Sequence, residues 1–163
     1  MRLASLITAM ALALGAAAPS TVLAQATLAA SAKVLVNAKN GLALEGYDPM
    51  SFFAVGAPTR GQPAITAEHN GATYRFASEA NRARFATDPE KYAPQYGGFC
   101  AYGMAKGYAA PVVIETAQIV DGRLMLNYDR SVQKTFDADR AAYVASADAN
   151  WPKVLEKKGI TPR

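Results

Sequence analysis

The stretch Lys91-Tyr-Ala-Pro-Gln-Tyr-Gly-Gly-Phe-Cys-Ala-Tyr-Gly-Met-Ala-Lys-Gly107 carries the most distinctive chemistry of this chain. It holds Cys100, the sole cysteine, and Met104 follows four residues later. A thiol and a thioether are soft ligands that select Cu(I) and similar ions. In a strand the two side chains would lie about 13 Å apart, whereas in a helical turn their Cβ atoms would be about 6 Å apart. A shared metal site therefore requires a helical turn from Cys100 to Met104, in spite of Gly103.

The same two residue types also pack well in protein interiors. Free cysteine is among the most buried residue types, and methionine fills irregular gaps in cores. An interior role for Cys100 and Met104 is therefore at least as common an outcome as metal binding. The sequence leaves both interpretations open.

The N-terminus has the features of a secretory signal peptide. Arg2 precedes an apolar run over residues 3–18, and small residues lead to an expected cleavage site after Ala24, with Ala26 as an alternative. The apolar run is too short for a helix that spans a membrane. We therefore expect a signal peptide at 1–24, a disordered lead-in at 25–32 and a single domain at 33–158, located in the periplasm or secreted.

Charge and cysteine content exclude several function classes. Removing the leader takes away Arg2 and lowers the formal net charge from +4 to +3, and the basic residues are scattered in ones and twos. This pattern is not that of a nucleic-acid groove or a membrane-binding helix. We expect no nucleic-acid partner and no stable membrane insertion after cleavage. One cysteine allows no internal disulfide, so the fold depends on its core.

Two turn signals predict β-hairpins. Asn70-Gly71 is a strong hairpin signal and predicts paired strands at 65–68 and 73–76. Asp121-Gly122 predicts a second hairpin within 118–127. Together with the helical segments, these patterns predict an α+β fold in which a small antiparallel sheet from two hairpins packs with short helices.

Capping residues and periodicity predict the helices. Asp48 and Ser78 are expected N-caps of short helices. The pattern over 129–155 is helical, with expected breaks near 137–139 and at 150–152, where a proline occurs. The expected core contributors from this half of the chain are Leu124, Leu126, Phe136, Tyr143, Val144 and Trp151.

Several stretches together resemble the YHS domain family in its exported, single-domain bacterial form. The matching stretches are residues 45–53, 70–78, 81–89, 91–92, 94–104, 119–127 and 147–152. The resemblance implies a small α+β domain that binds metal ions, above all copper, with no established catalysis. Cys100 and Met104 lie in the family's Gly-x-Cys-Ala-x-x-Met segment, whereas the multi-cysteine sites of related domains have no counterpart here. Tyr74 and Ser78 lie near the pattern that gives the family its name.

The soft and imidazole ligands of the expected mature chain are few. They are Cys100, His69, Met50, Met104 and Met125. A closed zinc site of four cysteine and histidine ligands needs more than one chain supplies. Cu(I) accepts fewer and softer ligands, so we expect a copper site at Cys100 and Met104, completed by His69, for buffering or delivery to a protein partner. A solvated His69 beside the hairpin turn is the alternative.

We do not expect an enzyme, because a nucleophilic Cys100 would need the sole histidine and a third orienting group, and no local motif supplies them. Two alternatives to metal binding remain open. One is a non-catalytic interaction or small-ligand domain with Cys100 in its core, where Tyr92, Tyr96 and Tyr102 either rim a pocket or simply pack. The other is a thiol that responds to oxidants, which requires an exposed, activated Cys100.

Overall fold

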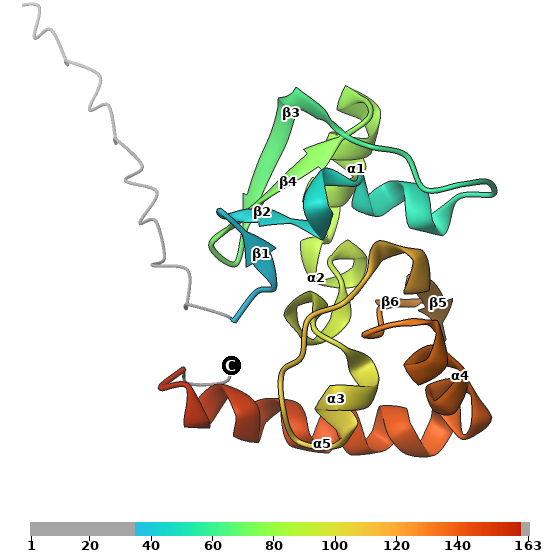
Figure 1. Cartoon of the computed structure of the whole chain (residues 1–163). Coiled ribbons are helices and arrows are strands. Elements are labelled where there is room, and N and C mark those ends of the chain that lie inside the picture. Colours follow the sequence, from blue (N-terminus) through green and yellow to red (C-terminus); the bar gives the residue numbers. More distant parts are fainter. Residues whose placement is uncertain (1–34, 161–163) are drawn as a thin grey trace, which may run out of the picture.

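The structure of the protein, a computed structural model, describes residues 35–160. The expected signal peptide at 1–24 and the expected lead-in at 25–32 lie outside the described residues. In the described part, a lobe built around a small sheet stands over a lobe built around helices (Figure 1). We call them the sheet lobe and the helical lobe, and the short helix α2 lies between them.

The sheet lobe contains a four-stranded sheet in the order β1-β2-β4-β3. The strands are β1 Ala38–Lys39, β2 Leu42–Ala43, β3 Gln62–His69 and β4 Ala72–Phe76. β3 and β4 form the predicted hairpin, with φ of +52° at Asn70 and +77° at Gly71. Positive φ at both central residues is what a two-residue type I′ hairpin turn needs. The sheet is mixed rather than purely antiparallel, because β2 runs parallel to β4.

The second predicted hairpin is also present, but it forms a separate two-stranded sheet in the helical lobe. Its strands are β5 Gln118–Val120 and β6 Arg123–Met125. The turn residues Asp121 and Gly122 again have positive φ, +49° and +75°. The α+β class is therefore confirmed, with the two hairpins in different sheets.

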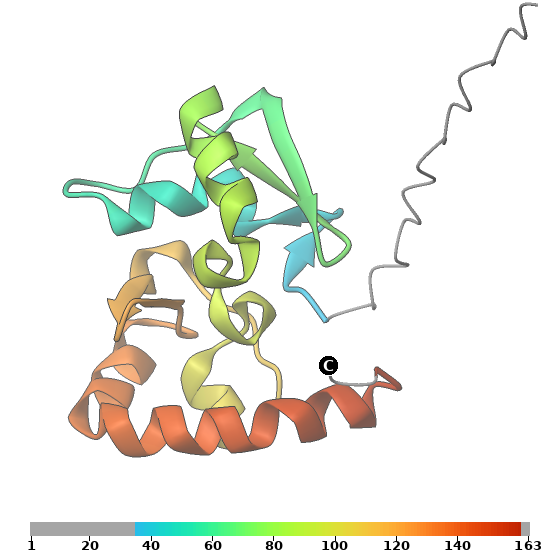
Figure 2. The same cartoon turned by 180° about the vertical axis from the view of Figure 1, so that it is seen from behind.

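The helices are mostly short, as predicted, with one exception. The α-helices are α1 Glu79–Thr87, α2 Pro89–Tyr92, α3 Ala101–Ala105, α4 Arg130–Ala138 and α5 Arg140–Lys157. The 3-10 helices are η1 Leu44–Gly46, η2 Pro49–Phe53, η3 Gln95–Gly98 and η4 Ile114–Thr116. α1 packs against β3 and β4 and is seen best from behind (Figure 2).

Both expected N-caps are confirmed. Ser78 accepts a hydrogen bond from the Asn81 N–H at 3.1 Å at the start of α1. Asp48 accepts from the Met50 N–H at 2.8 Å, and its second oxygen accepts from the Ala77 N–H at 2.8 Å. Asp48 thus caps η2 and also ties it to the end of β4, which explains how a carboxylate can be fully buried there.

The predicted break at 137–139 is confirmed, since α4 ends and α5 begins around Asp139. The predicted break at 150–152 is wrong, because α5 continues through Pro152. Pro152 has no N–H to donate to the carbonyl one turn earlier, which normally ends or kinks a helix. Here α5 packs along α3, and the Asn150 side chain donates to the carbonyls of Met104 at 3.3 Å and Ala105 at 3.0 Å. Tertiary contacts therefore override the local signal.

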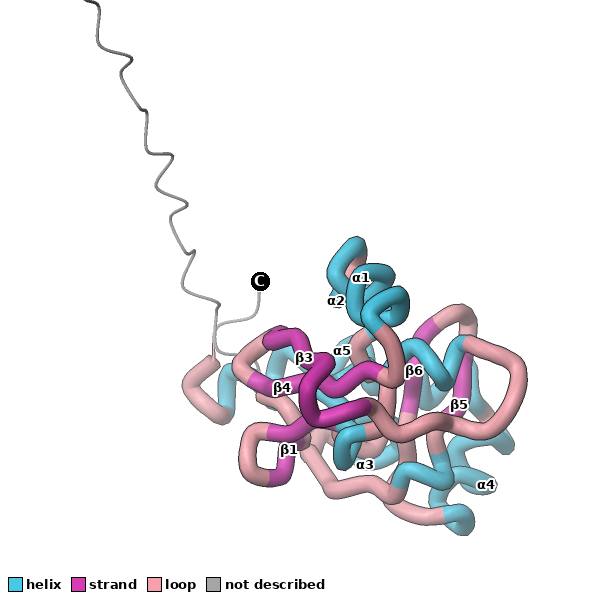
Figure 3. The backbone as a smooth tube through the Cα atoms, turned by 90° about the horizontal axis from the view of Figure 1, so that it is seen from above, coloured by secondary structure: helices cyan, strands magenta, loops and turns pink. Residues whose placement is uncertain are grey.

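The described residues contain two clusters of buried apolar side chains. The first surrounds Tyr74 and Phe76 of β4 and extends into the helical lobe through Leu124 and Leu126, and the second surrounds Met104 and Phe136. Of the expected core contributors, Leu124, Leu126 and Phe136 are buried, while Tyr143, Val144 and Trp151 are partly buried against the second cluster. Viewed from above, α1 and α2 lie to one side of the strands (Figure 3). The lobes meet at η3 and α2, which both contact β6, and at η2, which contacts β5. The segment from 91 to 107 passes from one lobe to the other.

Candidate functional site

Cys100 begins helix α3, so the helical turn that a shared site requires is present. Its Sγ accepts a hydrogen bond from the Gly103 N–H at 3.3 Å and lies 3.7 Å from Oδ1 of Asn127. The same Oδ1 accepts from the Tyr102 N–H at 3.2 Å. Cys100 is only 1% exposed. The thiol is therefore enclosed and already hydrogen-bonded, and the condition for an oxidant-responsive thiol, exposure, is not met.

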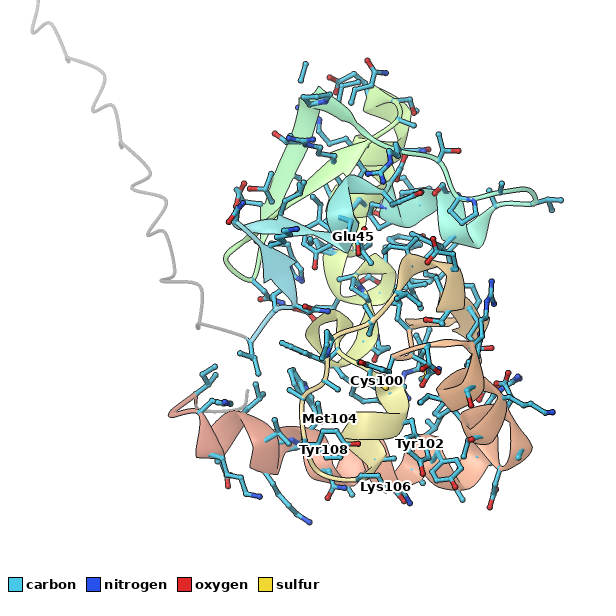
Figure 4. All side chains as sticks on the ribbon, in the orientation of Figure 1. Glu45, Cys100, Tyr102, Met104, Lys106 and Tyr108 are labelled. Carbon is cyan, nitrogen blue, oxygen red and sulfur yellow. The ribbon has the colours of Figure 1, made fainter. Side chains whose placement is uncertain are left out.

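Met104 lies one turn further along α3, in the second core cluster, with no exposed surface (Figure 4). Its N–H donates to the Cys100 carbonyl at 2.8 Å. Gly103 between them has a packing role, because a Cβ there would lie 3.2 Å from the Tyr108 ring and 3.3 Å from Ala110 Cβ. The chain that returns past α3 closes tightly over this turn.

His69 lies at the end of β3 in the sheet lobe, and its side chain is 13% exposed. Its Nε2 lies 2.9 Å from Nδ2 of Asn70 and 3.4 Å from Oε1 of Glu90. Its ring packs against Tyr74 and Phe85. Burial lowers the pKa of His69, outweighing the opposing effect of the Glu90 charge, so the imidazole is neutral at pH 7.

The structure thus brings two of the three expected metal ligands onto one helical turn. The third, His69, lies in the sheet lobe and packs against Tyr74 and Phe85. Residues 35–160 contain no group of three or more histidine, cysteine or carboxylate side chains placed to hold a metal ion. A metal at Cys100 would depend on sulfur and backbone ligands that are now buried. Copper binding stays a prediction of the sequence.

A cavity of about 220 Å³ lies between the two lobes. Its wall is built from the chain before β1, the β3–β4 turn, β4, α2, η3, β6 and α5. The polar side chains in the wall include Asn70, Glu90, Gln95, Arg123 and Asp148. Aromatic residues complete it, namely Tyr74, Tyr96 and Trp151. The cavity therefore combines fixed polar groups with aromatic surface.

Arg123 and Asp148 form an ion pair in this wall. The guanidinium donates to both carboxylate oxygens, at 2.6 and 3.0 Å, and its Nε donates to Oε1 of Gln95 at 3.0 Å. The Tyr96 hydroxyl donates to Asp148 at 2.8 Å. The hydrogen bonds from Arg123, more than those from Tyr96, lower the pKa of Asp148 against the opposing effect of burial. Burial raises the pKa of Tyr96, so the phenol stays protonated.

Tyr74 contributes an unusual group to the cavity. The residue is 2% exposed, and its hydroxyl makes no side-chain hydrogen bond within residues 35–160, yet it is not among the enclosed polar atoms there that lack a partner, which are represented by Nδ2 of Asn127. Burial first, and the Glu90 charge second, raise the pKa of Tyr74, so the hydroxyl remains a donor at neutral pH. A hydroxyl of this kind, in the wall of a cavity, is available to a ligand.

Sequence reasoning identified Tyr96 as a possible pocket residue and His69 as a residue of interest beside the hairpin. It missed Glu90, Arg123 and Asp148. No local pattern marks them, because they come from α2, β6 and α5 and meet only in the folded chain.

Comparison with known proteins gives no match: no family model, no curated protein and no solved structure matches this chain. The resemblance to the YHS domain family therefore stays a prediction from the sequence. Among the helices between residues 35 and 160, none has the length and apolar character needed to cross a membrane.

Proposed function

We propose that this protein is an exported, non-catalytic domain that binds a small ligand in the cavity between its lobes. The observation that carries the proposal is the meeting of a fixed Arg123–Asp148–Tyr96 network with the hydroxyl of Tyr74 in one cavity. Ligand sites are concave and largely pre-formed, with a few placed polar groups and perturbed pKa values. A volume of about 220 Å³ lies below the roughly 300–1,000 Å³ of sites for drug-sized ligands, so the cavity suits only a small ligand.

The titration behaviour of the wall supports binding rather than proton transfer. A general acid or base works best with a pKa near the operating pH. The pKa values of Tyr74 and Tyr96 are raised and that of Asp148 is lowered, so all three pKa values lie further from pH 7 than the ordinary values of these groups. These groups keep one protonation state at pH 7 and act as fixed donors and acceptors.

The surroundings of Cys100 agree with the same proposal. Its thiol is buried and hydrogen-bonded at the start of α3, away from the residues that line the cavity. An interior thiol of this kind contributes to packing. Ligand binding is then a property of the cavity, and Cys100 belongs to the core.

The test uses Trp151, the sole tryptophan of the chain, which lines the cavity and packs edge-on against Tyr96. Tryptophan emission is titrated with choline, glucose and acetate at constant ionic strength, using the chain from Gln25. We expect a saturable change in emission with at least one compound. The affinity for that compound should be about tenfold lower in Tyr74→Phe, because one hydrogen bond is lost. Tyr92→Phe is the matched control, because Tyr92 is buried outside the cavity wall.

Two outcomes would contradict the proposal. One is the absence of saturable change with all three compounds. The other is an equal effect of Tyr74→Phe and Tyr92→Phe on binding, because only the first variant alters the wall.

Copper buffering or delivery is a second candidate function, favoured by the helical turn that puts Cys100 and Met104 four residues apart on α3. Both sulfurs are buried, so an ion would reach them only after α3 moves. Anaerobic Cu(I) titration against a competing chelator tests this with wild type, Cys100→Ser and Met104→Leu. One tight equivalent that Cys100→Ser loses supports copper binding. Equally weak binding by all three proteins excludes it.

A further inference from the structure

We propose that the ligand of the cavity is a small organic cation, an ammonium group on a short carbon skeleton. This inference rests on the proposed function, that the cavity binds a small ligand, and adds the charge class of that ligand. Three features of the wall carry it: its net charge, the saturation of its only guanidinium among the described residues, and its aromatic surface.

The charged side chains in the wall do not balance. Arg123 contributes one positive charge, and Asp148 and Glu90 contribute one negative charge each, which leaves a net charge of −1. His69 beside Glu90 adds no charge at neutral pH. Lys91, the neighbour of Glu90 in sequence, points elsewhere, with its Nζ 5.4 Å from the centre of the Tyr92 ring. A cation would restore neutrality, and an anion would add to the imbalance.

Arg123 is not free to bind an anion. A guanidinium has five N–H donors, and Arg123 directs them at Gln95, at both oxygens of Asp148 and at the Tyr96 hydroxyl, the last at 3.3 Å. At most one N–H remains, whereas recognition of a carboxylate or phosphate by arginine uses two parallel N–H groups. The cavity therefore lacks the fork that an anionic ligand needs.

Glu90 is the carboxylate without a cationic partner. Its Oε1 lies 3.4 Å from Nε2 of the neutral His69 and 3.5 Å from Nδ2 of Asn70, and its Oε2 has no ion-pair or hydrogen-bond partner within residues 35–160. Its side chain is 76% exposed, so its attraction for a cation is partly screened by solvent. A second source of attraction is needed inside the cavity.

Trp151, a partly buried residue of the wall, supplies that attraction, because the face of an indole ring attracts cations electrostatically. Tyr74 and Tyr96 contribute less, since they are only 2% and 4% exposed and the Arg123 guanidinium already lies 5.7 Å from the centre of the Tyr96 ring. Apolar side chains such as Ala93 and Pro152 complete the wall and suit the carbon groups of an alkylated ammonium. The Tyr74 hydroxyl can donate to a hydroxyl on the ligand.

The test compares two probes of the same shape, choline and its uncharged isostere 3,3-dimethyl-1-butanol, in which carbon replaces the charged nitrogen. Trp151 emission reports binding to wild type, Glu90→Gln and Glu156→Gln. Glu156 is an exposed carboxylate of α5 that does not line the cavity, so it is the matched control. We expect choline to bind wild type and Glu156→Gln about tenfold more tightly than the isostere. Glu90→Gln should lower this preference by about two- to fivefold, the share that an exposed charge contributes.

Equal binding of the two probes would overturn the cation assignment and leave the small-ligand function intact. The same holds if acetate binds more tightly than choline. An undiminished preference for choline in Glu90→Gln would overturn the role of Glu90. If choline, the isostere, glucose and acetate all fail to give saturable change, the proposed function fails together with this inference. Circular dichroism of each variant confirms that the fold is retained.

Discussion

The turn at Cys100 and the cavity between the lobes are opposite kinds of candidate site. Cys100 and Met104 lie within five residues of sequence, and both side chains are enclosed by the fold. The cavity wall is assembled from distant segments, and its Tyr96 and Asp148 are 52 residues apart in sequence. The turn at Cys100 carries side chains that could bind a soft metal, but it has no open space for an ion. The cavity has open space, and no local sequence motif marks the polar groups in its wall.

The difference teaches that residue type and spacing indicate what a site could bind, whereas packing decides whether anything can reach it. The α3 turn is buried because α5 packs along it. Asn127 closes the other side, although its own Nδ2 is buried without a partner within the described chain. Such a group costs about 1–3 kcal/mol, which the packing around it must offset. Four predictions test this contrast.

Met104→Ala should have the largest effect on folding. Removing a fully buried side chain from the second core cluster should lower the free energy of unfolding by about 2–5 kcal/mol, measured by urea denaturation. Met104→Leu keeps the volume and should cost less than about 1.5 kcal/mol. A loss below about 1 kcal/mol in Met104→Ala would mean that this side of α3 is not tightly packed.

Cys100→Ala should destabilise the protein by about 1–2 kcal/mol, because the Gly103 N–H and Asn127 Oδ1 lose their contact with the thiol. Cys100→Ser keeps a donor and an acceptor at this position and should cost less. In wild type, a thiol reagent should label Cys100 only as fast as the protein opens. Immediate labelling in native buffer would contradict the burial of the thiol.

Asp148→Asn should cost about 1 kcal/mol at pH 7, because the carboxylate and Arg123 are both partly exposed. The pKa of Asp148 is lowered in the folded protein from its ordinary value of 3.8. The stabilisation is therefore fully present above pH 3.8 and is lost as the pH falls through the folded pKa. Urea denaturation at pH 7, 4 and 3 should show the gap between wild type and variant closing. A stability difference between wild type and Asp148→Asn that grows in acid would contradict the lowered pKa of Asp148.

Glu90→Gln should have the smallest effect on stability, within about 0.5 kcal/mol, because the side chain is largely exposed. The comparison predicts that this carboxylate matters for binding and hardly at all for folding. Thermal unfolding of wild type and variant checks it. A loss above about 1 kcal/mol would show that Glu90 holds the lobes together.

Features set by neighbouring residues were predictable from the sequence. Asn70-Gly71 and Asp121-Gly122 form the expected turns because few other residues adopt positive φ, and Ser78 caps α1 because its hydroxyl reaches the Asn81 N–H. Pro152 misled the prediction, since the packing of α5 on α3 outweighs a missing hydrogen bond. The pairing of β2 with β4 was also beyond local rules.

The candidate site was predictable only in fragments. Tyr96 and His69 attracted attention by residue type, but neither signals a cavity. Arg123 belongs to an ordinary hairpin and Asp148 to the middle of a helix, so each looks like a surface residue in sequence. Their pairing depends on how the hairpin and α5 dock, which no pattern over a few residues encodes.

The long sequence separation within the cavity wall has a consequence for the order of folding. The Tyr96–Asp148 and Arg123–Asp148 hydrogen bonds join residues 52 and 25 positions apart. Contacts of this kind form only after the entropy of closing long loops has been overcome, whereas the turns and short helices need only local contacts. We expect the wall to be among the last features completed during refolding. In stopped-flow experiments the recovery of Trp151 emission would then lag behind the recovery of secondary structure. The cavity would become able to bind a ligand only when the native state has formed.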